Sequence, residues 1–286
     1  MAEPQSSEIS FVFFTFNDDY RLEYALRNVL GFGEVVVFDD GSTDNTKAVA
    51  EKFGVKFLTR PKTPGSYLET PEVFEFVKQN TKYNWIYWGY VDNMLPAALI
   101  KKLVELSKQD HYKYIFVPVN TYLWGDVTHP IIKAAYPCFF RKDFMDFSEH
   151  RIHSLGHFTG PKTEVLELKN TKELTLRHFS LYDLNKFVTA HLRYANAEAT
   201  TKMSEGRKFS LTYMFGSMGN YFWLFYRRGF KAKVIGLYSA MLYAFFRLMV
   251  SVRMYELEHD LDLKTIEAAF AKEKQKMLDE INTPKV

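Results

Sequence analysis

The segment from Glu34 to Thr46 limits the possible folds more than any other part of the chain. Four apolar β-forming residues predict a buried strand, which ends in two carboxylates, Asp39 and Asp40. Gly41 permits a tight turn, and one of the next three polar residues can cap a helix. In an open α/β sheet, ligands bind at the carboxyl ends of strands, where these carboxylates would accept hydrogen bonds from a nucleobase or ribose. A capped Asp-rich turn without a ligand is the alternative.

Strands and helices alternate through the first half of the chain. Short apolar runs predict strands, and apolar residues at helical spacing predict the helices between them. The expected strands are 9–15, 34–38, 55–58, 85–91 and 114–119, and the expected helices are 18–30, 43–53, 71–80 and 95–107. This alternation predicts a mostly parallel, doubly wound α/β sheet flanked by helices.

Composition adds limits on compartment and partners. The formal net charge of +3 is too small to indicate nucleic acid by itself, and no base-reading motif is present, so we expect no nucleic-acid partner. A single cysteine, Cys138, excludes an intrachain disulfide framework and fits a reducing compartment. The first residues lack the basic and apolar regions of a signal peptide, so the expected location is cytoplasmic.

A second apolar strand, expected at 85–91, also ends in a carboxylate, Asp92. Together with the Asp-Asp-Gly-Ser-Thr-Asp run at 39–44, it resembles the family 2 glycosyltransferases of the GT-A (Rossmann-like) fold. The resemblance implies that the first cluster binds the nucleoside of a sugar nucleotide and that Asp92 holds a divalent metal, Mn²⁺ or Mg²⁺, on its diphosphate. Tyr90 replaces the first carboxylate of the family's Asp-x-Asp motif, and Asp92 could instead cap the following helix.

The resemblance also assigns roles to residues elsewhere. His178, in a short expected strand at 174–180, is similar to the histidine that closes the metal site of many GT-A enzymes, and a structural role is its alternative. The residues expected to bind substrate are Thr15, Asn17, Asp39, Asp40, Ser42, His191 and Tyr194. His191 and Tyr194 lie where relatives have Lys-x-x-Tyr, so His191 replaces a lysine.

The catalytic base has no complete signature. An inverting transferase needs a carboxylate near the acceptor hydroxyl to remove its proton. Residues 149–154 resemble the segment where lipopolysaccharide-core glycosyltransferases have His-Glu, and here His153 is followed by Ser154. The expected base is therefore Glu149, with Asp146 as second candidate and Glu164 in reserve.

The last part of the chain has a different character. Residues 206–255 contain no Asp or Glu but eight Lys or Arg residues, with many aromatic residues between them. This pattern suits an anionic membrane surface, to which each basic residue contributes about 1 kcal/mol. Residues 234–252 are apolar except for Arg247, which makes a membrane span marginal. We expect helices lying in the membrane interface, with a buried helical pair or an oligomer interface as the alternative.

These observations predict two domains and one reaction. Residues 1–180 are expected to form the GT-A catalytic domain, and residues 181–286 a helical, membrane-proximal appendage. The expected reaction is inverting transfer of a hexose from a nucleoside diphosphate sugar, with UDP favoured, to a hydroxyl of a glycan or glycolipid. The enzyme would be cytoplasmic and peripheral to the membrane. The competing hypothesis is a catalytically decayed protein that still binds sugar nucleotide or membrane.

Overall fold

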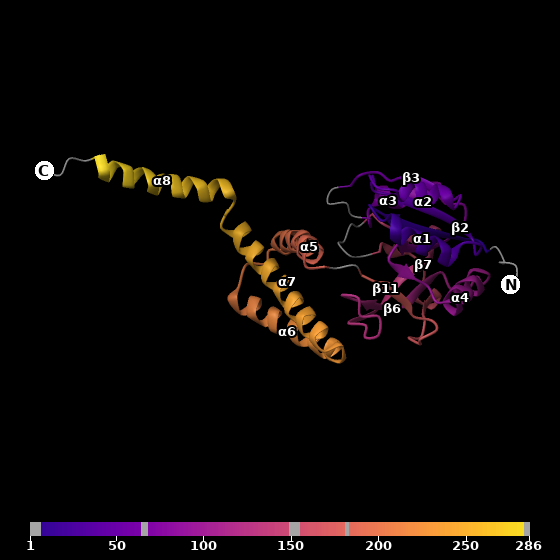
Figure 1. The fold of residues 1–286 in the computed structure, drawn as a ribbon. Helices are drawn as coiled ribbons and strands as arrows, with labels where there is room; N and C mark the ends of the chain where they lie inside the picture. Colours follow the sequence, from indigo (N-terminus) through magenta and orange to yellow (C-terminus); the bar gives the residue numbers. More distant parts are fainter. Residues whose placement is uncertain (1–6, 64–67, 149–154, 181–182, 283–286) are drawn as a thin grey trace. The chain divides into compact units, whose positions relative to one another are not determined.

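The computed structural model describes residues 7–63, 68–148, 155–180 and 183–282. The chain divides into two compact units, Met1–Tyr182 and Asp183–Val286. The first unit is an α/β sheet with flanking helices, and the second consists of helices (Figure 1). The boundary expected after residue 180 is close to this division after Tyr182.

The strands of the first unit alternate with helices as far as β6, except that the two-residue β5 follows β4 directly. In chain order the elements are β1 Ile9–Thr15, α1 Asp19–Val29, β2 Glu34–Asp39, α2 Thr46–Lys52, β3 Lys56–Thr59, α3 Pro71–Asn80, β4 Trp85–Tyr90, β5 Asn93–Met94, α4 Ala97–Ser107 and β6 Tyr114–Tyr122. They continue with β7 Ile132–Arg141, η2 Lys142–Phe144, β8 Met145–Asp146, β9 His157–Phe158, η3 Lys162–Glu164, β10 Val165–Glu167 and β11 Leu176–Phe179.

The main sheet has the strand order β3-β2-β1-β4-β7-β6-β11-β5, with β10 also paired to β6. Strands β1 to β4 are mutually parallel, and β1 lies between β2 and β4. The chain therefore leaves β1 toward β2 on one side and returns to β4 on the other. This reversal between β1 and β4 is the switch point at which open α/β sheets bind ligands.

Alternate residues of the central strands pack on opposite faces of the sheet. On β1, Phe11 and Phe13 join a core with α1, α2 and α4, whereas Val12 and Phe14 join a second core with α3. Because both faces are covered, the central strands are apolar almost throughout, as buried parallel strands must be. The expected mostly parallel α/β sheet flanked by helices is confirmed.

Strands β7 and β5 run antiparallel to the strands beside them. The ten-residue β7 runs antiparallel to both β4 and β6, and Arg141 at its end pairs with Trp85 at the start of β4. Strand β5 is likewise antiparallel to β11. Since β7 ends at the amino edge of β4, the segment that follows it begins at the edge opposite to Asp92.

The second unit contains α5 Leu184–Ser204, α6 Leu211–Gly229, η4 Phe230–Ala232, α7 Val234–Glu258 and α8 Leu263–Asn282. Helices α6 and α7 approach so closely at their turn that a Cβ on Gly236 would lie 1.9 Å from the carbonyl oxygen of Gly229. Only a glycine fits this position. The turn therefore fixes α6 and α7 as a helical hairpin.

Arg247 on α7 is buried in this helical unit. Its guanidinium donates to Ser217 Oγ at 2.8 Å, to Glu198 Oε2 at 2.8 Å and to the Tyr213 hydroxyl at 2.9 Å. By length and composition, α7 could cross a membrane. In the folded helical unit, however, the charge of Arg247 near the middle of α7 is paired with Glu198.

Candidate active site

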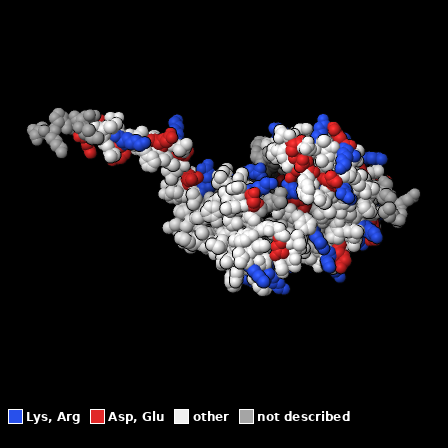
Figure 2. Space-filling model, viewed as in Figure 1, with Lys and Arg blue, Asp and Glu red and all other residues white. Residues whose placement is uncertain are grey.

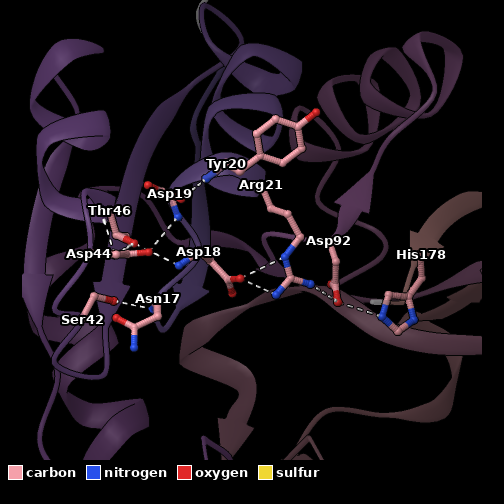
Figure 3. Close-up of polar contacts among 10 residues, drawn as sticks. All are labelled: Asn17, Asp18, Asp19, Tyr20, Arg21, Ser42, Asp44, Thr46, Asp92 and His178. Atoms are coloured by element: carbon pink, nitrogen blue, oxygen red, sulfur yellow. Dashed lines mark hydrogen bonds and ion pairs between the residues drawn. The ribbon is translucent and has the colours of Figure 1, made fainter. Parts of the chain in front are cut away.

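Three loops meet at the carboxyl ends of β1, β2 and β4. In the β1–α1 loop, Asn17 has a φ of 51°, in the left-handed region, and its backbone N–H donates to Ser42 Oγ at 2.7 Å. Its side-chain Oδ1 accepts from the backbone N–H of Thr43 at 2.8 Å. The loops that follow β1 and β2 are therefore tied together by hydrogen bonds (Figure 3).

Asp44 extends this connection to the first turn of α1. Its Oδ1 accepts from the backbone N–H of Thr46 at 3.0 Å, and its Oδ2 accepts from that of Asp19 at 3.3 Å. Thr46 Oγ1 in turn accepts from the backbone N–H of Asp18 at 3.0 Å. Of the three cap candidates, Asp44 is the one that bonds to the first residue of α2.

Asp39 holds the turn that follows its own strand. Its buried carboxylate accepts from the backbone N–H groups of Gly41 and Ser42, both at 2.8 Å, and from Ser42 Oγ. Gly41 has a φ of 88°, which favours glycine at this point of the turn. Most of the acceptor capacity of Asp39 is thus used inside the loop. Nucleotide binding by Asp39 and Ser42 remains a prediction.

Asp40 and Thr15 have different surroundings. Asp40 Oδ2 lies 2.9 Å from Nη2 of Arg60, whose side chain is only 2% exposed. Thr15 Oγ1 is buried at the end of β1, next to Asp39 in register, and has no hydrogen-bond partner among the described residues. Substrate binding by Asp40 and Thr15 also remains a prediction.

Asp92 and His178 meet on the other side of the switch point. Nε2 of His178 lies 3.1 Å from Oδ2 of Asp92, and its Nδ1 lies 3.1 Å from Thr121 Oγ1. Arg21, on the first turn of α1, brings Nη1 to within 3.4 Å of the same Asp92 oxygen (Figure 3). The structure therefore brings together the two residues expected to bind metal, and it adds a cation.

The charges around Asp92 control its protonation. Burial alone raises the pKa of this carboxyl, but the charge and hydrogen bond of His178 and the charge of Arg21 outweigh it and hold the pKa below its usual range. Asp92 is therefore ionised at neutral pH.

The donor atoms fit a divalent metal that shares its shell with a ligand. The buried Oδ1 of Asp92 has no hydrogen-bond partner in the part of the chain that the structure describes. An oxygen and an imidazole nitrogen suit Mn²⁺, while Mg²⁺ prefers oxygen ligands alone. No group of three or more His, Cys, Asp or Glu side chains that could hold a metal occurs among the described residues. The protein would thus supply Oδ1 of Asp92 and, once its Nε2 has lost the proton that it donates to Asp92, His178. Phosphate oxygens and water would be the other ligands.

Tyr90, which replaces the first acid of the Asp-x-Asp motif, is hydrogen-bonded to another carboxylate. Its hydroxyl donates to Glu69 Oε1 at 3.1 Å. Burial, together with the charge and hydrogen bond of Glu69, raises the pKa of Tyr90 well above its usual value. Tyr90 is therefore a neutral hydrogen-bond donor.

The candidates for the base lie away from this cluster or outside the described residues. Asp146 is exposed on β8, where a hydrogen bond from the Ser148 backbone lowers its pKa and makes it a weaker base. Glu149, like His150 and His153, lies outside the described residues. Glu164 lies 2.7 Å from Lys113 Nζ. The roles of Glu149 and Asp146 in catalysis remain predictions.

His191 and Tyr194 belong to α5 of the helical unit. The His191 ring is buried, stacked on Phe187 and packed edge-on against Tyr243, and its Nδ1 lies 2.8 Å from the Phe187 carbonyl oxygen. Because a carbonyl only accepts, Nδ1 must carry the proton. Tyr194 contacts the His191 ring and lies under Arg193. Their expected contact with substrate stays a prediction.

Sequence reasoning did not identify Arg21, Asp18 or Thr121 as site residues. The spacing of Asp18 and Arg21 by three residues is a signal for a helical ion pair, and Arg21 Nε does lie 2.9 Å from Asp18 Oδ1. The contact of Arg21 with Asp92 spans 71 residues and depends on the sheet topology. No sequence pattern could have indicated it.

An α/β sheet with polar loops at its switch point places the protein among the α/β proteins that bind a ligand at this edge, and comparison with known proteins identifies the family. The model of glycosyl transferase family 2 matches residues 10–166, more than half of the chain. The chain therefore belongs to glycosyl transferase family 2. It is a glycosyltransferase.

The individual proteins that resemble this chain have low sequence identity to it. An uncharacterized glycosyltransferase of Rickettsia bellii (strain RML369-C) is 27% identical over 270 residues, covering 90% of this chain and 89% of that protein. Glucosyl-3-phosphoglycerate synthase from Mycobacterium tuberculosis, solved with phosphoglyceric acid, is 15% identical with a TM-score of 0.45, covering 71% of this chain and 82% of that one. The mannosyltransferase PcManGT from Pyrobaculum calidifontis, solved with GDP-Man and Mn²⁺, is 11% identical with a TM-score of 0.42, covering 96% and 81%.

Proposed function

We propose that this glycosyltransferase moves a hexose from a UDP-sugar to a hydroxyl group of a glycan or glycolipid, with inversion at the anomeric carbon. The donor would bind across the switch point, with its nucleoside near Asp40 and its diphosphate near Asp92. The observation that supports this most strongly is the contact of Asp92 with His178. It combines a half-buried ionised carboxylate, an imidazole and a buried oxygen without a partner among the described residues, at the edge of the sheet where ligands bind.

In the proposed reaction the acceptor oxygen forms a bond to the anomeric carbon while the bond from that carbon to the diphosphate breaks. A carboxylate would accept the acceptor's proton, and the bond electrons leave with UDP. Of the two predicted bases, Glu149 is the one proposed here, because Asp146 on β8 follows the end of β7 at the sheet edge opposite to Asp92. Asp92 and His178 would hold Mn²⁺ or Mg²⁺, which supplies positive charge to the departing diphosphate. The hydroxyl of Thr121 would keep the His178 ring oriented.

We also propose that the helical unit binds an anionic membrane surface, so that the enzyme is cytoplasmic and peripheral to the membrane. Large apolar side chains are exposed at helical spacing on both arms of the hairpin: Leu211, Phe215, Trp223, Tyr226 and Phe230 on α6 and η4, and Leu237, Met241, Phe245 and Val252 on α7. Exposed apolar surface of this kind is typical of membrane or protein contact.

Charge favours the membrane as the partner of this surface. Arg227, Arg228, Lys231 and Lys233 all lie at the turn between α6 and α7, and residues 206–255 contain no acid. In Figure 2, blue atoms gather at that turn, while the visible surface of the hairpin beside them is largely white. Cations beside exposed aromatic rings match the headgroup region of an anionic bilayer.

Calorimetric titration of the full chain with UDP, GDP and ADP, each with and without Mn²⁺, tests the donor site. We expect UDP to bind most tightly with Mn²⁺, and Asp40→Asn to weaken it more than tenfold, because a lost hydrogen bond to a charged group costs about 1.5 to 3 kcal/mol. Asp40 is a better choice than Asp39, whose substitution would also disrupt its turn.

The exposed Asp110 is the matched control, since its side chain is 86% exposed on the same unit. Asp110→Asn should bind UDP as the wild type does. If the wild type binds no nucleotide with or without Mn²⁺, the proposed donor site is wrong.

A further inference from the structure

Arg21 places a permanent positive charge between two carboxylates of the site. Its Nε lies 2.9 Å from Oδ1 of Asp18, and its Nη1 lies 3.4 Å from Oδ2 of Asp92. Figure 3 shows this side chain extending from α1 to Asp92, with His178 on the far side of the carboxylate. The contact joins the first turn of α1 to the loop after β4, and so it spans the switch point.

This charge opposes a metal at Asp92. A guanidinium stays protonated at all relevant pH values, and the Asp92 side chain that it faces is largely shielded from water. Even in a water-like dielectric, the repulsion between a +1 and a +2 charge about 6 Å apart lowers the metal affinity about tenfold. Asp92 Oδ2 also already accepts from both Arg21 and His178.

A diphosphate offers Arg21 a better partner. The planar guanidinium donates two parallel hydrogen bonds to phosphate oxygens, whereas its contact with Asp92 is a single long one at 3.4 Å. The Arg21 side chain is 24% exposed, so a ligand can reach it. Its place on the first turn after β1 is next to the edge where the ligand of an open α/β sheet binds.

We propose that Arg21 competes with the divalent metal for Asp92, so that the free enzyme binds metal weakly and a diphosphate draws the guanidinium away as the metal enters. This inference rests on the proposed donor site. Metal and nucleotide then bind cooperatively, and the enzyme does not accumulate metal in the absence of donor. By linkage, each ligand raises the affinity for the other by the same factor.

Titration of the full chain with Mn²⁺, followed by the electron paramagnetic resonance signal of free Mn²⁺, measures this competition directly. We expect Arg21→Gln to bind Mn²⁺ alone at least tenfold more tightly than the wild type does. UDP should raise the Mn²⁺ affinity of the wild type strongly and that of Arg21→Gln much less. Arg21→Lys, which keeps the charge, should stay near the wild type.

Arg27 on the same helix provides the matched control, because it pairs with Glu23 at 3.4 Å and is 64% exposed. Arg27→Gln should leave both Mn²⁺ affinities unchanged. Arg21→Met, which keeps the apolar stem, replaces the Gln variant if that protein is unstable.

Equal Mn²⁺ affinity of the wild type and both uncharged variants, including no measurable binding in any of them, would overturn the proposed competition. A gain in Mn²⁺ affinity with the same UDP effect as in the wild type would overturn the part assigned to the diphosphate. Failure of the wild type to bind UDP with Mn²⁺ would instead contradict the proposed donor site.

Discussion

Nε2 of His178 lies 3.1 Å from Oδ2 of Asp92, although 86 residues separate them in the chain. Strand β11 makes this possible by pairing with both β6 and β5, which places His178 opposite Thr121 and Asn93. The Thr121 hydroxyl can donate to Nδ1 or accept from it. Because the ionised Asp92 only accepts, Nε2 carries a proton in this arrangement. A metal at Nε2 would require the other tautomer, in which Nδ1–H donates to Thr121.

Replacement of Asp92 by Asn should weaken Mn²⁺-dependent UDP binding more than tenfold, because the side chain keeps its shape but loses its charge. Binding of UDP without metal should change less. Calorimetry with and without Mn²⁺ separates the two effects, with Asp110→Asn as control. If Asp92→Asn retains full Mn²⁺ dependence, the metal binds elsewhere.

His178 should influence which metal the enzyme prefers. Imidazole is a good ligand for Mn²⁺ and a poor one for Mg²⁺, so His178→Ala should lose Mn²⁺-supported UDP binding more than Mg²⁺-supported binding. His129→Ala, in a histidine that pairs with Asp126 at 3.0 Å, is the control. An equal loss with both metals would indicate that His178 only orients Asp92.

The basic turn of the hairpin should determine membrane binding. Sedimentation with anionic vesicles should recover the wild type, whereas simultaneous change of Arg227, Arg228, Lys231 and Lys233 to Gln should release most of the protein, because each charge contributes about 1 kcal/mol. Added salt should weaken the binding of the wild type to anionic vesicles, since the Debye length falls from about 10 Å at 0.1 M to about 3 Å at 1 M. Neutral vesicles and UDP titration are the controls. Equal sedimentation of both proteins, or none by the wild type, would favour a protein contact for the exposed apolar surface.

Arg247 should be important for the stability of the helical unit. Arg247→Gln should lower the free energy of unfolding by about 2 to 4 kcal/mol, because the side chain is buried and its loss leaves Glu198, Tyr213 and Ser217 without this donor. Chemical denaturation measures the change. Arg253→Gln, at a half-exposed position on the same helix, should cost less than about 1 kcal/mol. Similar losses for both variants would mean that the buried network contributes little.

His191 should make stability depend on pH near neutrality. Burial lowers the pKa of His191 below its ordinary value of 6.5, against the opposing hydrogen bond to Phe187. Below pH 6.5 the unfolded chain takes up a proton that the folded one resists, so the contribution of His191 is present above this pH and is lost as the pH falls. Thermal unfolding midpoints between pH 5 and 8 should fall more steeply toward acid for the wild type than for His191→Phe. If the two proteins show the same pH dependence, a group other than His191 is responsible for it.

Apart from the two-residue β5, the order of strands and helices up to β6 could be predicted because apolar runs and capping residues are local signals. Strand β7 was not among the expected strands, and its direction could not be predicted, since strand periodicity is the same in parallel and antiparallel pairing. The helical unit likewise could be predicted only in part. Its sequence identified Arg247 as an obstacle to a membrane span, but only the packing of α5, α6 and α7 shows that Glu198 neutralises it.

For the site, the sequence predicted two apolar strands, β2 and β4, and showed that an Asp comes at or just after the end of each. The resemblance to a family suggested that His178 would lie near Asp92. Arg21 could not be found in this way, because an ion pair with Asp18, three residues earlier, already accounts for it in the sequence. The contact with Asp92 exists only once β1 and β4 lie side by side.

The hydrogen bonds that join Asn17 to Ser42 and Thr43, and Asp44 to Asp19, have a thermodynamic consequence for ligand binding. They hold the two loops in one conformation before any donor arrives. Fixing a loop residue costs about 1 to 2 kcal/mol of conformational entropy, and here folding of the protein has already met that cost. More of the interaction energy with a sugar nucleotide then appears as affinity, and the loops themselves become part of the recognition surface.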